Sequence, residues 1–143
     1  MRVLSVSISE KKGVKKHPVE YINVIEDYGI EGDAHAGKWH RQVSLLGVES
    51  MEAMKEKLPT LSAGDFAENI LTEGIVLYEL PIGTILKVGE CTLEVTQIGK
   101  ECHHGCEIRH IVGDCVMPRE GIFTKVLKSG KIKADDKIEI VEK

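Results

Sequence analysis

The sequence predicts a mainly β protein, a closed or partly open β-barrel with one clear helix and short helical turns. Two observations support this fold class. Short segments with strand character recur along the chain, and turns rich in glycine, of which there are 14, separate them. A single segment, Val48–Leu58, has helical periodicity instead. Closing the sheet would remove its exposed edges, which favours a barrel over an open sheet.

The N-terminal part contains two strand candidates joined by a basic turn. Val3–Ser9 alternates apolar and small polar residues, Lys11–Lys16 is expected to be an exposed turn, and Val19–Ile25 is the second strand candidate. The next segment, Asp27–Gln42, is rich in glycine and has no periodicity, so it predicts a long loop. Long ordered loops often carry function. Val43–Gly47 predicts a short buried strand.

The helix candidate follows directly. Its residues are good helix formers, and Val48, Met51, Met54 and Leu58 fall on one face. A proline stands just after the last of them, which is typical of a helix end. The segment therefore predicts an amphipathic helix.

Strands are expected to return in the second half of the chain. The candidates are Phe66–Leu71, Gly83–Gly89, Cys91–Gly99, Gly121–Gly130 and Lys137–Glu142. Between them, Cys106–Cys115 is a candidate short helix. At 143 residues the chain is expected to form one domain that spans residues 1–143.

Charge and composition argue against several classes of protein. The chain has 19 basic and 23 acidic residues, so neither nucleic acid nor a membrane surface is expected as a partner. Its two Phe, one Trp and three Tyr residues make a base-stacking platform unexpected. There is no signal-peptide pattern, and no apolar run approaches the ~18 residues of a membrane span. We therefore expect a cytoplasmic protein with reduced cysteines.

The segment KECHHGC concentrates thiols and imidazoles. Cys102 and Cys106 are separated by two histidines and a glycine. As a zinc site this pair is incomplete, because structural zinc takes four ligands, usually in two separated pairs. Cys115 or His110 could complete the set, so a zinc site stays open.

Cys102 is also a candidate reactive thiol. Lys100, Arg109 and two histidines place positive charge around it, and such charge lowers the pKa of a thiol. A thiolate is a nucleophile and a soft ligand, suited to sulfur transfer or to a soft metal. The alternative is that the cysteines are small buried hydrophobic residues, which we favour for Cys91.

The glycine-rich loop holds further candidates. Asp33, His35, His40 and Arg41 could converge on an anionic ligand or on each other. Alternatively, Asp33 and Arg41 form a structural ion pair that holds the loop. No phosphate-loop motif is present, and a strand rather than a helix follows. Trp39 could belong to the core or to a pocket wall.

Two later motifs, GDFAENI and MPREGIF, carry polar groups. Asp65, Glu68 and Asn69 lie close together in the first motif, and paired carboxylates can perform acid–base chemistry. Such residues more often cap turns and bind backbone. In the second motif, Arg119 offers a bidentate fork for a phosphate or carboxylate, unless Glu120 pairs with it.

These motifs, in this order, resemble the MOSC domain: GDAHAGKWHRQVSLL, GDFAENI, LPIGTILKVGECTLEVTQIGKEC and MPREGIF. The resemblance extends from Arg2 to Val141 and is strongest to short, stand-alone prokaryotic members. It implies a strand-rich β-barrel that binds a molybdopterin-type cofactor or carries sulfur, as a persulfide, to a metal–sulfur centre. It also implies partners: proteins of molybdenum cofactor biosynthesis or molybdoenzymes, and a cysteine desulfurase as sulfur donor.

The resemblance assigns roles to individual residues. The key residue of the family is a cysteine after the long strand, which ligates molybdenum in the amidoxime-reducing relatives. In this sequence that position is Cys102. By the same resemblance Arg41, Asp65 and Asn69 would line the cofactor pocket. Apart from the resemblance, we expect Asp33, His35, Arg41, Lys100 and Arg119 to offer charge and hydrogen bonds to the phosphate and pterin of such a cofactor.

The sequence departs from the family pattern in a few places. Cys106 and Cys115 add thiols, which keeps additional metal ligation or a persulfide relay open. Asp135 stands where the family often has glycine, and the turn there is still expected to form because Asp tolerates the left-handed conformation. We expect no counterpart of the desulfurase domain of larger relatives, with its pyridoxal phosphate.

Two alternatives to cofactor handling or sulfur carriage remain open. The first is a molybdenum-dependent reductase of N-hydroxylated compounds. It would need an external electron donor, because the chain has no flavin or iron–sulfur motif. The second is a non-enzymatic zinc-binding module built on the cysteines.

Overall fold

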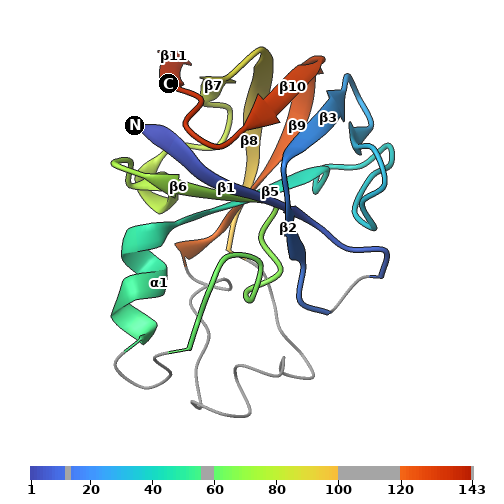
Figure 1. Cartoon of the computed structure of the whole chain (residues 1–143). Helices are drawn as coiled ribbons and strands as arrows, with labels where there is room; N and C mark the ends of the chain where they lie inside the picture. Colours follow the sequence, from blue (N-terminus) through green and yellow to red (C-terminus); the bar gives the residue numbers. More distant parts are fainter. Residues whose placement is uncertain (12–13, 56–59, 100–119, 143) are drawn as a thin grey trace.

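The computed structural model describes residues 1–11, 14–55, 60–99 and 120–142 (Figure 1). This part of the chain is mainly β, with one α-helix, α1 (Val48–Met54), and one 3-10 helix, η1 (Leu77–Glu79). The predicted mainly β class with one clear helix is therefore confirmed. Within these ranges, no helix has the length and apolar character needed to cross a membrane.

The strands form two sheets. Eight strands make the larger sheet in the order β11-β7-β8-β9-β5-β6-β1-β2, and three make the smaller one in the order β10-β3-β4. Their bounds are β1 (Arg2–Ile8), β2 (His17–Val19), β3 (Tyr21–Ile25), β4 (Gly29–Ile30), β5 (Val43–Gly47), β6 (Ile70–Glu73), β7 (Ile85–Val88), β8 (Cys91–Ile98), β9 (Ile122–Lys128), β10 (Gly130–Lys133) and β11 (Ile138–Glu142). The pair β5–β6 is parallel. Parallel neighbours need a crossover connection, and α1 lies in this connection.

The larger sheet is not closed, so the predicted barrel is not confirmed. Its order runs from β11 to β2, and these two edge strands do not pair. The opposite ends of the chain nevertheless meet. Arg2 forms an isolated bridge with Lys137, and the Val3 N–H donates to the Asp136 carbonyl at 2.8 Å. The two chain ends accordingly lie close together in Figure 1.

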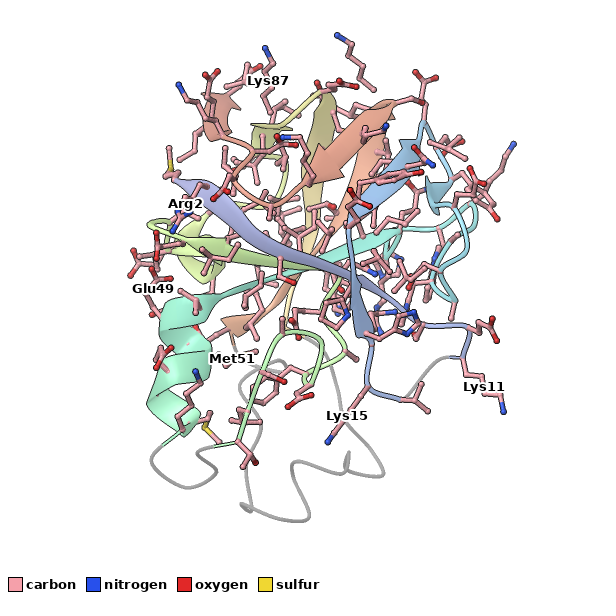
Figure 2. The ribbon with its side chains drawn as sticks, in the orientation of Figure 1. Arg2, Lys11, Lys15, Glu49, Met51 and Lys87 are labelled. Atoms are coloured by element: carbon pink, nitrogen blue, oxygen red, sulfur yellow. The ribbon has the colours of Figure 1, made fainter. Side chains whose placement is uncertain are left out.

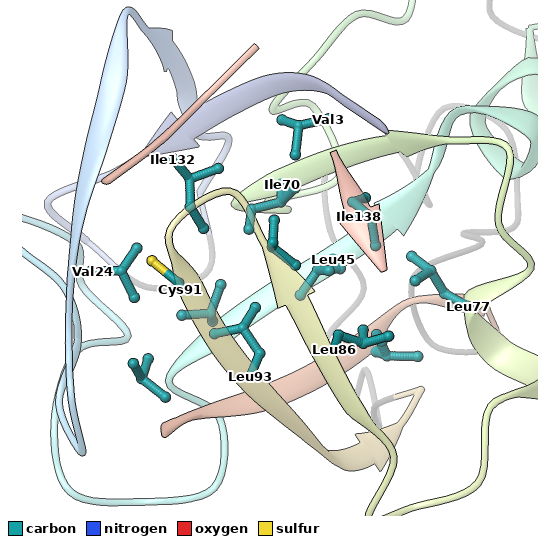
Figure 3. Close-up of a cluster of buried hydrophobic side chains, with 14 of the residues drawn as sticks. Val3, Val24, Leu45, Ile70, Leu77, Leu86, Cys91, Leu93, Ile132 and Ile138 are labelled. Carbon is teal, nitrogen blue, oxygen red and sulfur yellow. The ribbon is translucent and has the colours of Figure 1, made fainter. Parts of the chain in front are cut away.

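The main hydrophobic core draws side chains from both sheets. In β8 buried and partly exposed residues alternate: Cys91, Leu93 and Val95 are fully buried, and the residues between them are partly exposed. Val24 and Ile132 contribute to the same cluster from the smaller sheet (Figure 3). Period-two alternation thus brings one face of β8 into the core.

Strand β5 is buried on both faces, which explains why its sequence VSLLG does not alternate. Leu45 belongs to the main core, whereas Leu46 belongs to a second cluster. Met51 and Met54, from the predicted apolar face of α1, pack in this second cluster together with Phe123. Figure 2 shows α1 beside the sheet and labels Met51. Because α1 and the main core cover opposite faces of β5, this strand is the centre of the molecule.

Some predicted bounds were wrong. The strand expected at Phe66–Leu71 begins only at Ile70, because Ala67 has a left-handed φ of 62° and the preceding residues form a turn. The strand expected at Val19–Ile25 is interrupted at Glu20. The short strands β4 and β10 were not predicted. The candidate helix at Cys106–Cys115 lies outside the described residues.

The turn at Asp135 forms as expected. Its φ of 73° is in the left-handed region, which Asp tolerates better than most residues. The Asp135 carboxylate accepts a hydrogen bond from Arg2 Nη1 at 2.5 Å. The neighbouring Asp136 carboxylate accepts one from the Lys133 N–H at 2.9 Å.

We expect Cys91 to be unreactive in the folded protein. Its side chain is fully buried, and this burial raises the pKa of the thiol to about 12, so the thiol stays protonated near neutral pH. Labelling with iodoacetamide at pH 8, followed by peptide mass spectrometry, should leave Cys91 unmodified in the native protein and modify it in urea. Fast native labelling of Cys91 would be inconsistent with its place in the core.

Candidate functional site

A buried ion pair between Lys16 and Asp33 is the polar centre of the glycine-rich loop. Lys16 Nζ lies 2.8 Å from Asp33 Oδ1, and neither side chain has exposed surface. The Ser9 N–H donates to Asp33 Oδ1 at 3.1 Å, and the His35 N–H donates to Asp33 Oδ2 at 3.1 Å. Asp33 therefore joins the end of β1, the segment before β2 and its own loop.

The predicted exposed turn at Lys11–Lys16 is wrong for Lys16, whose side chain has no exposed surface. Its Nζ also lies 3.1 Å from Ser9 Oγ and 3.1 Å from His35 Nδ1. Its backbone packs directly on Gly64: a Cβ atom at Gly64 would lie 2.1 Å from the Lys16 carbonyl oxygen, so only glycine allows this approach. Nothing in the run KKGVKK distinguishes Lys16 from its neighbours, and only the tertiary contacts identify it.

Trp39 connects the ion pair to a second group of polar side chains. The rings of His35 and Trp39 stack with centroids 6.2 Å apart, and Trp39 Nε1 donates to the His35 carbonyl at 2.7 Å. The ring of His40 meets Trp39 edge-on at 5.9 Å. Trp39 is half-buried and lies between the rings of His35 and His40, so it is not part of the hydrophobic core.

Arg41 does not pair with Asp33, so the structural pair considered from sequence is wrong. Arg41 Nε donates to Gln97 Oε1 at 3.0 Å, and the guanidinium lies over the Phe123 ring at 5.1 Å. His40 Nε2 lies 2.9 Å from the same Gln97 oxygen. Within the described ranges, the two terminal nitrogens of Arg41 have no hydrogen-bond partner. Gln97 and Phe123 therefore fix the position of the guanidinium, while its two terminal nitrogens can still donate hydrogen bonds.

We call these residues the Trp39 row: Lys16, Asp33, His35, Trp39, His40, Arg41 and Gln97. The last residue of the row, Gln97, lies near the end of β8. Its Nε2 donates to the Gly99 carbonyl at 2.7 Å. The Gly99 N–H in turn donates to the Gly121 carbonyl at 2.6 Å. Residues 100–119 lie between these two glycines and outside the described part of the chain. They include the predicted site residues Lys100, Cys102, Cys106, Cys115 and Arg119.

Asp65 and Asn69 make structural contacts. Asp65 Oδ2 accepts the Ser62 N–H at 3.0 Å, as a turn-capping residue does. Asn69 is buried; its Oδ1 accepts the Ser44 N–H at 3.0 Å, and its Nδ2 donates to the Ser7 carbonyl at 3.1 Å. Asn69 thus ties its loop to β5 and β1. That either residue lines a cofactor pocket stays a prediction.

Glu68 is the buried acid of the same loop. Its two carboxylate oxygens accept the Gly64 N–H at 2.6 Å and the Phe66 N–H at 3.2 Å. Burial raises the pKa of Glu68 to about 7, against the opposing effect of these N–H donors. The acids of GDFAENI therefore fold their own loop, which agrees with the turn-capping interpretation.

A metal site requires several ligand side chains that converge on one point. No group of three or more His, Cys, Asp or Glu side chains in this part of the chain is placed to hold a metal ion. The cysteines considered for zinc or molybdenum belong to residues 100–119, so zinc and molybdenum binding by these cysteines stay predictions.

Removing the charge of Asp33 should destabilise the fold strongly. Asp33→Asn would remove the carboxylate that the buried Lys16 ammonium contacts at 2.8 Å, and breaking a buried ion pair in this way costs about 3–5 kcal/mol. Asp27→Asn is the matched control, because Asp27 is half-exposed and lies 3.6 Å from Lys125 in a surface ion pair; we expect it to cost at most about 1 kcal/mol. Urea unfolding measures both. Equal costs would show that the buried pair has no special role.

The raised pKa of Glu68 makes stability depend on pH. The folded carboxyl, with a pKa of about 7, binds its proton more tightly than an unfolded carboxyl at about 4.5. Its contribution is therefore present below pH 4.5 and is lost as the pH rises through 7. Over this window the wild type should lose about 2–3 kcal/mol relative to Glu68→Gln. Urea unfolding from pH 4.5 to pH 8 tests this. A difference that does not vary with pH would refute it, and exposed Glu52→Gln is the control.

Comparisons with known proteins identify similar folds and a family. No curated protein sequence matches this chain significantly. Among solved structures, the chain is similar to the YuaD protein from Bacillus subtilis, with 17% identity, a TM-score of 0.80, and coverage of 96% of this chain and 93% of that chain. It is also similar to YiiM from Geobacillus stearothermophilus (19% identity, TM-score 0.74, 99% and 75% covered) and YiiM from Escherichia coli (21%, 0.70, 100% and 71%).

At these identities the solved structures show a shared fold. The sequence match is more specific: residues 32–139 match the MOSC domain. This range begins in the glycine-rich loop and ends in β11, so it contains most of the chain and most of the Trp39 row. The chain therefore belongs to the MOSC domain family, which is associated with molybdenum cofactor binding.

Proposed function

We propose that this chain binds a molybdopterin-type cofactor along the Trp39 row and uses Cys102 either to ligate molybdenum or to carry a persulfide sulfur. The observation that carries the proposal is the position of Arg41. Gln97 holds one nitrogen of its guanidinium, Phe123 packs against the guanidinium, and the terminal nitrogens have no partner in the described ranges. Arginine in this state is suited to bidentate binding of a phosphate group.

The charge of the row also fits an anionic ligand. Asp33 is its one carboxylate, and Lys16 neutralises it at 2.8 Å. Arg41 is therefore not opposed by an unpaired acid within the row. His40 and Trp39 add ring surface beside Arg41, which can contact a planar heterocycle. The residues present thus fit a group with a phosphate and a flat ring system.

Each residue of the row would have a distinct task. Arg41 would bind the phosphate, and Gln97 would orient Arg41 through its Nε. The Lys16–Asp33 pair would position the loop and would not contact the ligand, since both side chains are buried. When bound, the cofactor would supply a molybdenum centre, which accepts soft sulfur ligands.

Cys102 enters the proposal through its place in the sequence. It stands three residues after Gly99, whose carbonyl accepts the hydrogen bond from Gln97 at 2.7 Å. A thiolate there would serve as a soft ligand or as a sulfur carrier. The proposed partners are then proteins that make or use the molybdenum cofactor, and a cysteine desulfurase that donates sulfur.

Cofactor loading tests the proposal. Chain purified from a host that makes the cofactor should contain molybdenum and pterin in equal amounts, measured by elemental analysis and by fluorescence of the oxidised pterin. Arg41→Met should lower loading at least about tenfold, because a hydrogen bond to a charged group contributes about 1.5–3 kcal/mol. Cys102→Ser should lose molybdenum or cyanide-releasable sulfur.

Lys87→Met is the matched control for charge. Lys87 is an exposed residue of β7 outside the Trp39 row (Figure 2), so its variant should load as the wild type does. The proposal is wrong if protein purified with its native partners carries neither molybdenum and pterin nor cyanide-releasable sulfur. It is also wrong if Arg41→Met and Lys87→Met load equally.

A further inference from the structure

The ammonium group of Lys16 lies close to a ring nitrogen of His35 as well as to two oxygen atoms. Its Nζ is 2.8 Å from Asp33 Oδ1, 3.1 Å from Ser9 Oγ and 3.1 Å from His35 Nδ1. An ammonium group can donate hydrogen bonds but cannot accept them. Each of these three atoms must therefore accept, and for the ring of His35 this decides which nitrogen carries the proton.

The two oxygen atoms meet this requirement. The ionised carboxylate of Asp33 has no proton to donate. The hydroxyl group of Ser9 donates its single proton to the Lys11 carbonyl at 2.9 Å, so its oxygen is left to accept from Lys16. The contact of 3.1 Å between Lys16 and the ring is likewise a hydrogen bond only if Nδ1 of His35 has a lone pair and no proton.

The alternative is that Nδ1 of His35 carries the proton and donates it to Asp33, but the distances do not fit. His35 Nδ1 lies 3.8 Å from Asp33 Oδ2, which is too far for a hydrogen bond. That oxygen instead accepts the backbone N–H of His35 at 3.1 Å. Lys16 is nearer to Nδ1 than Asp33 is, and a proton on Nδ1 would face an ammonium group. The distances therefore indicate a neutral ring with its proton on Nε2.

Trp39 and Asp33 keep the ring of His35 in this orientation. Trp39 Nε1 donates to the His35 carbonyl at 2.7 Å, and the Asp33 carboxylate accepts the His35 N–H, so the backbone is bound on both sides of the residue. The rings of His35 and Trp39 are nearly parallel, with an interplanar angle of 6°. Turning the imidazole over would put a carbon atom in the place of Nδ1 and lose the hydrogen bond from Lys16. Tautomer and ring orientation are therefore fixed together.

Of the three side chains in this cluster, that of His35 reaches the surface. It is 17% exposed, whereas the side chains of Lys16 and Asp33 have no exposed surface. The two ring nitrogens lie on different edges of the imidazole, so Nε2 is directed away from Lys16. Hydrogen bonds in a chain polarise one another, so a ring that accepts from an ammonium group at Nδ1 is a stronger donor at Nε2. The buried charge of Lys16 thus acts at the surface through His35.

We propose that Lys16 fixes His35 as the Nε2–H tautomer, and that this N–H donates a hydrogen bond to an oxygen atom of the molybdopterin-type cofactor. Lys16 is then a positioning residue, and His35 is a binding residue that acts as a donor. With a proton on Nε2, the ring offers a ligand no lone pair there, so it serves neither as a base nor as a metal ligand. The donor role rests on the proposed function, whereas the tautomer does not depend on any ligand.

The tautomer can be measured on the full chain without cofactor. Long-range ¹H–¹⁵N NMR at pH 8 distinguishes a ring nitrogen with a proton from one with a lone pair, and the spectrum of His35→Gln identifies the signals of His35. We expect separate signals for a protonated Nε2 and an unprotonated Nδ1. The exposed ring of His17 is the internal control and should give the averaged signals of two exchanging tautomers. A protonated Nδ1, or averaged signals like those of His17, would overturn the proposal.

Lys16→Met combined with Asp33→Asn tests whether Lys16 sets the tautomer. The double variant removes both charges of the pair, so neither is left buried alone. Without the ammonium group, the ring signals of His35 should move towards the averaged signals of His17, and unchanged signals would contradict the role of Lys16. Far-UV circular dichroism checks the fold. If the double variant does not fold, the wild-type spectrum and substitutions of His35 decide the question.

Two substitutions of His35 separate the donor role from a structural role. The amide of Gln reaches the position of Nε2 and can donate there. The shorter Asn reaches only the position of Nδ1, where its oxygen can accept from Lys16. His35→Gln should therefore keep most of the cofactor, and His35→Asn should lower the cofactor content about five- to tenfold. A purely structural role as a partner of Lys16 predicts the reverse order.

Molybdenum and pterin are measured in each variant after purification from the same host. His17→Asn, the same substitution at an exposed residue outside the Trp39 row, should match the wild type. Equal content in His35→Gln and His35→Asn, or the reverse order, would overturn the donor role. If Arg41→Met loses the cofactor while both His35 variants keep it, the donor role is wrong and cofactor binding stands. If the wild type binds no cofactor, the donor role fails with the proposed function, and the NMR result still decides the tautomer.

Discussion

The buried ion pair between Lys16 and Asp33 determines where the glycine-rich loop lies. Both charges are removed from water, and their mutual attraction offsets part of the cost of that burial. Ser9 and His35 bind the same carboxylate through their N–H groups, which joins β1 to the loop. From His35 the contacts continue through Trp39 to His40 and Gln97. Arg41 is therefore presented by a loop whose base is an ion pair closed to solvent.

The polar residues around the candidate site divide into two groups by their use of hydrogen bonds. Asp33, Glu68 and Asn69 are buried and bind the protein's own backbone, so they build loops. Buried polar atoms need such partners, and a partner within the fold occupies the capacity that a ligand would use. Arg41 uses one nitrogen for Gln97, and its other nitrogens have no hydrogen-bond partner among the residues that the structure describes. Residue type alone did not distinguish the two groups.

Strand β5 supports the proposed site at Arg41. It is buried on both faces, and Leu45 and Leu46 anchor it in two different clusters. Arg41 stands two residues before its first residue, Val43. Groups mounted on a rigid, doubly packed strand keep their geometry better than groups on a free loop. This strand thus restricts the movement of the backbone that carries Arg41.

The sequence by itself determined the local elements and the family. Strand character predicted a strand at Cys91–Gly99, and helical spacing predicted the face of α1 that holds Met51 and Met54. Ordered motifs indicated the MOSC domain. Local periodicity follows from chain geometry, so it is readable along the chain. Tertiary structure alone chose Lys16 as the partner of Asp33 and brought Thr72 to Gly47. It also left the larger sheet open, because edge pairing joins residues far apart in the chain, and no local pattern encodes which of several similar partners will meet.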